Sequence, residues 1–219
     1  MNLRLPTVGF LSLVILNACA AFWVERGPVV VPSRTLAPPE TRVWDVRSDP
    51  RAEVERWTRS TRVGLGGYVD AVLWDPTAAQ SQLAYEIALN HLGRAAASDL
   101  STQRWSTLYG AERDRFPIDL RWRFDEQFIA SRRILDPGTW RFELQLATGG
   151  PLSPHSVAVL KSSVSAQDGF WNGEVRLWFP WRDPVRHQLV LGGENPWVRL
   201  VMSHFSGNGE VTWRFPGAW

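Results

Sequence analysis

From about residue 116 to the carboxy-terminal end, hydrophobic and polar residues alternate with a period of two. Leu120, Trp122 and Phe124, for example, are separated by arginines. Successive side chains of a β-strand point to opposite faces, so this pattern predicts strands with one buried and one wet face. Turn signals rich in glycine, proline and aspartate separate the segments, which favours an antiparallel β-sandwich. The predicted strands are at 120–124, 140–146, 157–160, 175–179, 188–191, 198–202 and 211–215.

The chain before residue 100 carries helix signals instead. Asp49-Pro50 supplies an N-cap and a first-turn proline, residues 51–62 are good helix formers, and the glycines within 64–67 predict the end of that helix. Asp75-Pro76 repeats the start signal and predicts a second helix over 76–92. The apolar stripe and the stop of this second helix consist of Ala79, Leu83, Ile87, His91 and Gly93.

The stretch 98–109 is compatible with a third helix or with a strand that starts near Gln103. The predicted fold class is therefore α+β, mainly β, with a short helical amino-terminal segment before the antiparallel β-sandwich. We expect one domain over 44–219, with the helical segment at about 44–100 and the sandwich at about 101–219.

The first 18 residues have the composition of an export signal. One positive charge, Arg4, precedes an apolar run over 8–16, and small residues follow. This run is too short for a stable transmembrane helix, which needs about 20 apolar residues. Residues 24–43 contain four prolines without helical or strand periodicity, which is typical of a semi-extended tether.

Cys19 is the only cysteine of the chain and follows the apolar run directly. The stretch Leu16-Asn17-Ala18-Cys19 resembles the lipobox of bacterial lipoproteins. The resemblance implies that residues 1–18 are removed, that diacylglycerol is attached to the Cys19 sulfur, and that residues 19–43 form a lipidated proline-rich tether. Two or three acyl chains on one residue give stable membrane anchoring. Ala20, where aspartate would favour inner-membrane retention, favours the outer membrane in this family.

The body also resembles a loose class of bacterial envelope lipoproteins in which a helical part precedes an all-β part. The matching pieces are residues 198–202, Gly207 and residues 211–213. No activity is associated with this class. The resemblance implies an envelope protein whose partners are the membrane, through the acyl chains on Cys19, and envelope proteins or polysaccharide.

Composition removes several classes of function. The formal charge is +2, which gives no support to a nucleic-acid partner. The four histidines lack metal-ligand spacing, and no nucleophile elbow or phosphate-binding loop occurs, so no catalytic residue, metal ligand or cofactor is predicted. Pairs of carboxylates remain as candidate catalytic residues of a hydrolase with an unrecognised site, because glycosidases use such pairs. The candidate pairs are Asp70 with Asp75, Asp114 with Asp119, and Asp125 with Glu126.

Thirteen tryptophans are the remaining functional signal. Tryptophan suits surfaces that are partly apolar and partly wet, such as sugar-binding sites, and it also fills cores. Trp178 is predicted on the outer face of strand 174–179, where it contacts a ligand or is covered by the helical segment. The predicted ligand-facing residues are Trp171, Trp178, Trp181 and Trp197.

These patterns predict a lipid-anchored envelope protein with a non-catalytic structural or interaction role. A carbohydrate- or peptidoglycan-binding module that uses exposed tryptophans is one alternative. A hydrolase with an unrecognised site is the other.

The substitution Cys19→Ala tests the anchor. It removes the sulfur that would carry the diacylglycerol, so we expect it to abolish fatty-acid labelling and to release the protein from membranes into the soluble fraction. The wild-type chain, labelled in parallel, is the control. Labelling that persists unchanged in the variant would show that the lipobox interpretation is wrong.

Overall fold

The computed structural model of the chain describes residues 50–127, 132–162 and 169–215. Cys19, the predicted signal sequence over 1–18 and the predicted tether over 19–43 lie outside the described residues. Within them, the fold is mixed α/β, with antiparallel strands in two sheets and few helices. The elements in chain order are α1 (Pro50–Trp57), β1 (Thr58–Val63), β2 (Gly67–Leu73), α2 (Pro76–Leu89), α3 (Arg94–Tyr109), β3 (Arg115–Asp125), the 3-10 helices η3 (Arg132–Leu135) and η4 (Pro137–Thr139), β4 (Arg141–Leu146), β5 (Ser156–Ser162), β6 (Phe170–Pro180), β7 (Trp197–His204) and β8 (Gly207–Arg214).

Two sheets share one apolar core. One sheet has the strand order β1-β2-β3-β6-β5, and the other has the order β4-β7-β8. In each predicted strand that forms, the apolar alternate positions are the buried ones, as in β3, where Leu120, Trp122 and Phe124 are buried between exposed arginines. An exception is β5, which lies at the edge of its sheet and leaves Val157 and Val159 half-exposed. Buried side chains from both sheets pack into one cluster.

The predicted strand at 188–191 is wrong. This segment forms one isolated bridge, which joins Arg182 to Leu189, and Val190 donates its N–H to the carbonyl of Trp181. Val190 and Leu191 are nevertheless buried in the core. Their apolar character therefore reflects a loop that folds back over the end of β6, without a neighbouring strand to complete a ladder.

The predicted helix over 51–62 is wrong in its second half. Helix α1 ends at Trp57, and Thr58–Val63 is the strand β1, which pairs with β2 from Thr58↔Val72 to Val63↔Gly67. The glycines that follow Val63 form the hairpin turn, with Gly64 at φ +57°, instead of stopping a helix. The sequence Thr-Arg-Ser-Thr-Arg-Val is rich in β-branched residues, which suit a strand better than a helix.

The second helix begins where it was predicted and ends earlier. Asp75 is the N-cap of α2, and its carboxylate accepts the Ala78 N–H at 2.7 Å. The helix ends at Leu89, and His91 (φ +50°) reverses the chain before Gly93, the residue predicted as its stop. The ambiguous stretch 98–109 belongs to α3, which Gly93 precedes as N-cap.

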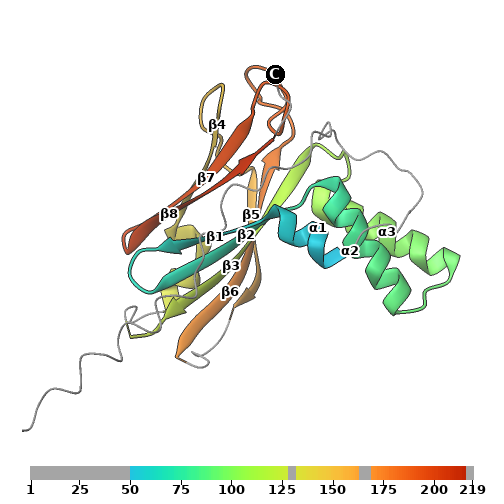
Figure 1. The fold of residues 1–219 in the computed structure, drawn as a ribbon, viewed down its shortest axis with the longest axis horizontal. Helices are drawn as coiled ribbons and strands as arrows, with labels where there is room; N and C mark the ends of the chain where they lie inside the picture. The colour runs from blue at the N-terminus through green and yellow to red at the C-terminus, as the bar shows by residue number, and fades with distance from the viewer. Residues whose placement is uncertain (1–49, 128–131, 163–168, 216–219) are drawn as a thin grey trace, which may run out of the picture.

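All three helices lie on one side of the five-stranded sheet, and α2 and α3 project away from it as a helical hairpin (Figure 1). At the end of α1, the Trp57 carbonyl accepts the indole N–H of Trp213 on β8 at 2.8 Å, which ties the first helix to the last strand. None of the described helices is long and apolar enough to cross a membrane. The helices therefore cover part of one sheet face and leave the rest of that face open.

The substitution Asp75→Asn tests the cap of α2. Burial is the main cause that raises the pKa of Asp75 from 3.8 to about 6, the Glu53 carboxylate adds to it, and the Ala78 and Thr77 hydrogen bonds oppose it. The folded state thus holds this proton more tightly than the unfolded state. The associated stability is fully present below pH 3.8 and is lost as the pH rises through about 6.

Asparagine caps helices as well as aspartate does and carries no charge. At pH 8 we expect the free energy of unfolding of Asp75→Asn to exceed that of the wild type by up to about 3 kcal/mol, and the gain to shrink towards zero near pH 4. Urea unfolding of both chains at pH 4 and pH 8 measures this difference in the free energy of unfolding. Asp136→Asn, at the exposed N-cap of η4, is the matched control. A gain of the same size at both pH values would contradict the prediction.

Candidate functional site

The outer face of the five-stranded sheet, opposite the shared core, carries a row of alternating charges. The strand register places Asp70 of β2 beside Arg121 of β3, Arg121 beside Glu174 of β6, and Glu174 beside Lys161 of β5. At the β1 end of the row, the Ser60 hydroxyl donates to Asp70 Oδ1. Opposite charges on neighbouring strands stabilise a sheet, so this row is polar without a net excess of either sign.

One pair further along the same face, Asp119 of β3 and Arg176 of β6 form a bidentate ion pair. The Arg176 Nε donates to Asp119 Oδ1 at 2.6 Å, and Nη2 donates to Oδ2 at 2.8 Å. Only 10% of the Asp119 side chain and 13% of the Arg176 side chain are exposed. A bidentate pair with little access to water is among the stronger polar interactions in proteins, and the register of the two central strands brings its partners together.

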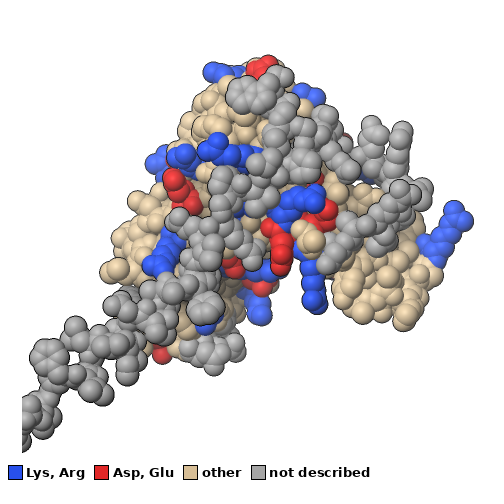
Figure 2. Space-filling model, in the orientation of Figure 1, with Lys and Arg blue, Asp and Glu red and all other residues tan. Residues whose placement is uncertain are grey.

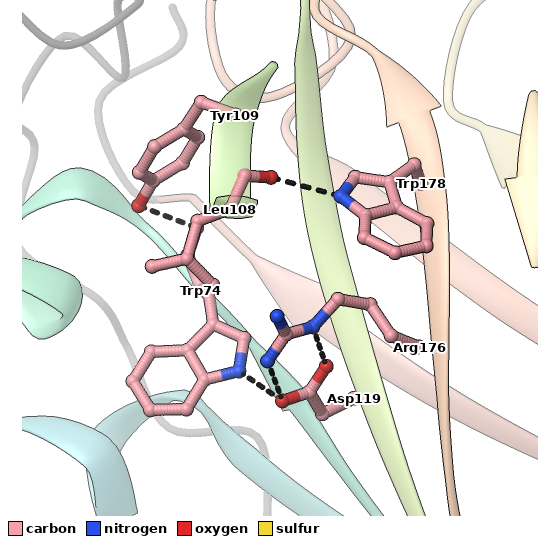
Figure 3. A network of polar contacts seen from close by, with 6 residues as sticks. All are labelled: Trp74, Leu108, Tyr109, Asp119, Arg176 and Trp178. Carbon is pink, nitrogen blue, oxygen red and sulfur yellow. Dashed lines mark hydrogen bonds and ion pairs between the residues drawn. The ribbon is translucent and has the colours of Figure 1, made fainter. Parts of the chain in front are cut away.

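Trp74, just before α2, completes this contact. Its indole N–H donates to Asp119 Oδ2 at 2.8 Å (Figure 3). Asp119 thus accepts three hydrogen bonds, two from Arg176 and one from Trp74. The chain between β2 and α2 is thereby fixed to the middle of the sheet, and the Trp74 ring is held at the junction of helix and sheet.

The end of α3 is fastened to the same place. The Trp178 indole N–H donates to the Leu108 carbonyl at 3.0 Å, and the Tyr109 hydroxyl donates to the Trp74 carbonyl at 3.3 Å (Figure 3). Burial raises the pKa of Tyr109 well above its usual value, so its hydroxyl keeps the proton that it donates. The guanidinium groups of Arg115 and Arg176 lie 5.2 and 5.9 Å from the centre of the Trp178 ring. The helical part is therefore positioned on the sheet by polar contacts of aromatic side chains.

A cleft of about 770 Å³ lies between the helices and the open part of the sheet face. Figure 2 shows charged side chains of both signs where the helical part meets the sheet. On the sheet side the cleft is lined by Thr58, Ser60, Asp70, Trp74, Arg121 and Arg176, and on the helix side by Arg51, Val54, Glu55, Ala79, Gln82, Leu83, Glu86, Arg104, Thr107 and Leu108.

The charges of the cleft are nearly balanced, since four arginines face three carboxylates. Glu86 of α2 binds Arg104 of α3 at 2.9 Å, and Asp70 accepts from Ser60. Arg121 is exposed on β3 between Asp70 and Glu174, and within the described part of the chain it forms no hydrogen bond or ion pair with either. The cleft therefore suits a polar ligand of low net charge that offers at least one hydrogen-bond acceptor to Arg121.

The four tryptophans predicted to face a ligand do not share a groove. Trp171 and Trp178 lie on opposite faces of β6, because Trp171 packs against the core and Trp178 lies on the outer face below α3. Trp181 is 2% exposed and stacks near Tyr109. Trp197 is on the other sheet, on β7, with the Arg199 guanidinium 5.5 Å from its ring centre. Of the two readings of Trp178, its hydrogen bond to α3 agrees with the one in which the helical segment covers it.

At least one member of each carboxylate pair named from the sequence has another partner, and in the third pair Asp125 accepts the Gln127 N–H. Asp119 binds Arg176, Asp70 accepts from Ser60, and Asp75 caps α2. Within residues 50–127, 132–162 and 169–215, no group of three histidine, cysteine or acidic side chains could hold a metal ion. The cleft residues that the sequence analysis missed are above all Trp74, Arg121 and Arg176. In the period-two pattern of the sequence, Arg121 and Arg176 are polar positions on the wet faces of two predicted strands. Only the pairing of those strands makes them neighbours.

No protein-family model, no curated protein and no solved structure matches the chain.

The substitution Arg176→Leu tests the ion pair that organises the site. It leaves the Asp119 carboxylate poorly solvated with Trp74 as its remaining partner, so we expect the free energy of unfolding to fall by about 3 kcal/mol. Replacing both residues, Asp119→Leu with Arg176→Leu, removes the stranded charge and should cost clearly less than the single variant. Urea unfolding followed by tryptophan fluorescence measures all three chains.

The matched control is Arg214→Leu, on an exposed position of β8, where we expect a change below about 0.5 kcal/mol. A double variant that is less stable than Arg176→Leu would contradict the prediction. It would show that losing the ion pair destabilises the fold more than leaving the Asp119 carboxylate without Arg176 does.

Proposed function

We propose that this protein is a lipid-anchored bacterial envelope protein whose body, a β-sandwich with a helical annex, binds another envelope component without transforming it. The observation that carries the anchor is the lipobox-like stretch Leu16-Asn17-Ala18-Cys19, which ends an apolar run and contains the only cysteine. The acyl chains on Cys19 would hold the protein to the membrane, and Ala20 favours the outer one.

The cleft supports the binding role. It has the size of a small-molecule or side-chain site, about 770 Å³, and its walls come from three helices and four strands. Its polar lining is held by contacts made within the protein, such as Glu86 with Arg104 and Asp119 with Arg176. Preformed walls of this kind reduce the ordering cost of binding. Arg121 supplies a donor that the rest of the site leaves for a ligand.

A polysaccharide or peptidoglycan fragment is the ligand that this lining favours. Trp74 offers part of an aromatic ring beside carboxylate and guanidinium groups, which is a combination suited to a sugar with apolar faces and hydroxyl edges. This version of the carbohydrate hypothesis uses Trp74, not the four tryptophans named from the sequence. A chain of sugars without strong charge also fits the nearly balanced charge of the cleft.

A photo-crosslinking residue in place of Thr107, which lines the cleft on α3, tests the binding role in the native envelope. We expect illumination to yield a covalent adduct, whose mass identifies it as glycan, peptide or protein. The same residue in place of Val185, which is 84% exposed and lies outside the cleft, should give none. Equal yields at both positions would contradict a binding role for the cleft.

Arg121→Ala adds a quantitative arm to this experiment. Loss of a charged hydrogen bond should lower the adduct yield at position 107 by about tenfold. Arg123→Ala, on the same face of the same strand but outside the cleft, is the matched control and should leave the yield unchanged. An adduct whose mass shows that its ligand was cleaved would favour the hydrolase alternative instead.

A further inference from the structure

Two hairpin turns each present one exposed large apolar side chain. Leu65, in the turn between β1 and β2, is 75% exposed, and Phe205, in the turn between β7 and β8, is 92% exposed. Phe205 is the most exposed large apolar side chain of the described residues, and Leu65 is the third, after Val185 at 84%. Both turns lie at the same end of the molecule, at the left of Figure 1.

The backbones of the two turns touch each other. A Cβ atom on Gly64 would lie 2.2 Å from the carbonyl oxygen of Ser206, and a Cβ atom on Gly207 would lie 2.3 Å from Gly64 Cα. Both glycines have positive φ, +57° and +146°. Side chains are therefore excluded from the contact, and the turns, which come from different sheets, form one rigid tip. Leu65 and Phe205 each lie next to a residue of this contact, so we name the pair the apolar tip.

Aromatic and basic side chains lie just behind the apolar tip on the five-stranded sheet. The Arg62 guanidinium is 5.7 Å from the Tyr68 ring centre, and that of Arg123 is 3.9 Å from the Phe170 ring centre. Two acids lie at the same place, Asp125 at the end of β3 and Glu126 directly after it, so these four charges cancel. In Figure 2 the outermost part of this end is uncharged and the charged side chains are set back from it.

We infer that the apolar tip inserts into the interfacial region of a lipid bilayer. A convex tip with two apolar residues offers too little surface for a stable protein interface, which needs about 800 Å² on each partner. It suits a bilayer instead, where apolar side chains enter the acyl boundary while aromatic and arginine side chains stay at headgroup level. Because the charges behind the tip cancel, insertion depends on the apolar side chains and not on anionic lipid.

This inference rests on the proposed lipid anchor, which would keep the tip near a membrane. Cys19 and Pro50 are 31 residues apart, a length that can reach about 95 Å when extended. From Pro50 to the tip, the eight residues of α1 and the six of β1 span at most about 32 Å. The chain between Cys19 and Pro50 is therefore long enough for the tip and the acyl chains to occupy the same bilayer.

The lone cysteine makes a direct test possible. In the mature lipidated chain the Cys19 sulfur is blocked, so Leu65→Cys or Phe205→Cys introduces a single free thiol that accepts an environment-sensitive fluorophore. The labelled proteins are reconstituted in vesicles of phosphatidylcholine, alone or with phosphatidylglycerol. We expect a blue-shifted emission and quenching by brominated lipid at positions 65 and 205 in both compositions. Val185→Cys, an equally exposed apolar position beyond the opposite end of β6, should show neither.

Fluorophores at 65 and 205 that stay in water would overturn the inference, and so would quenching confined to vesicles with phosphatidylglycerol. The Cys19→Ser chain separates this result from the fate of the anchor. Its partition into phosphatidylcholine vesicles should fall by roughly tenfold or more when Leu65→Ser and Phe205→Ser are added. A partition that these two changes leave untouched would also overturn the inference. Mass spectrometry of Cys19 in the wild-type protein tests the anchor independently.

Discussion

The bidentate ion pair between Asp119 and Arg176 is the contact on which the arrangement of the helices depends. The two central strands bury their inner faces against the second sheet, and the same strands meet the helices on their outer faces. A carboxylate and a guanidinium with so little access to water are stable only when hydrogen bonds within the protein replace their lost hydration. Asp119 accepts its third hydrogen bond from Trp74, and this bond fixes the position of the chain that leads into α2. The position of the cleft follows from that attachment.

A second set of contacts joins the two ends of the described chain. The Trp213 indole donates to the Trp57 carbonyl, and the Gly64 and Gly207 backbones touch where their turns meet. The edge strands β1 and β8 thus lie side by side without hydrogen-bonded pairing in one ladder. Such edges are a liability when exposed, and close packing of one against the other protects both. The same packing creates the rigid tip that carries Phe205, so edge protection and the proposed membrane contact share one structural cause.

The period-two pattern predicted most of the carboxy-terminal strands because burial there has a local signature: each apolar residue sits between two polar ones. The pattern failed where burial is not local. Residues 188–191 are apolar because a loop covers the end of β6, and no ladder accompanies them. The arginines of Thr58–Val63 and its position after Asp49-Pro50 predict a helix, whereas pairing with β2 makes it a strand. Intrinsic helix propensity is a weak signal that tertiary pairing overrides.

By itself, the sequence determined the alternation of buried and exposed faces, the start of α2 at Asp75-Pro76, and a single cysteine in a lipobox-like stretch, because each is a property of neighbouring residues. Only the tertiary structure decided which side chains meet. Asp119 and Arg176 are 57 residues apart and become partners through the register of β3 with β6. Arg121 and Trp74 line one cleft for the same reason, since cross-strand distance is set by pairing and not by separation along the chain.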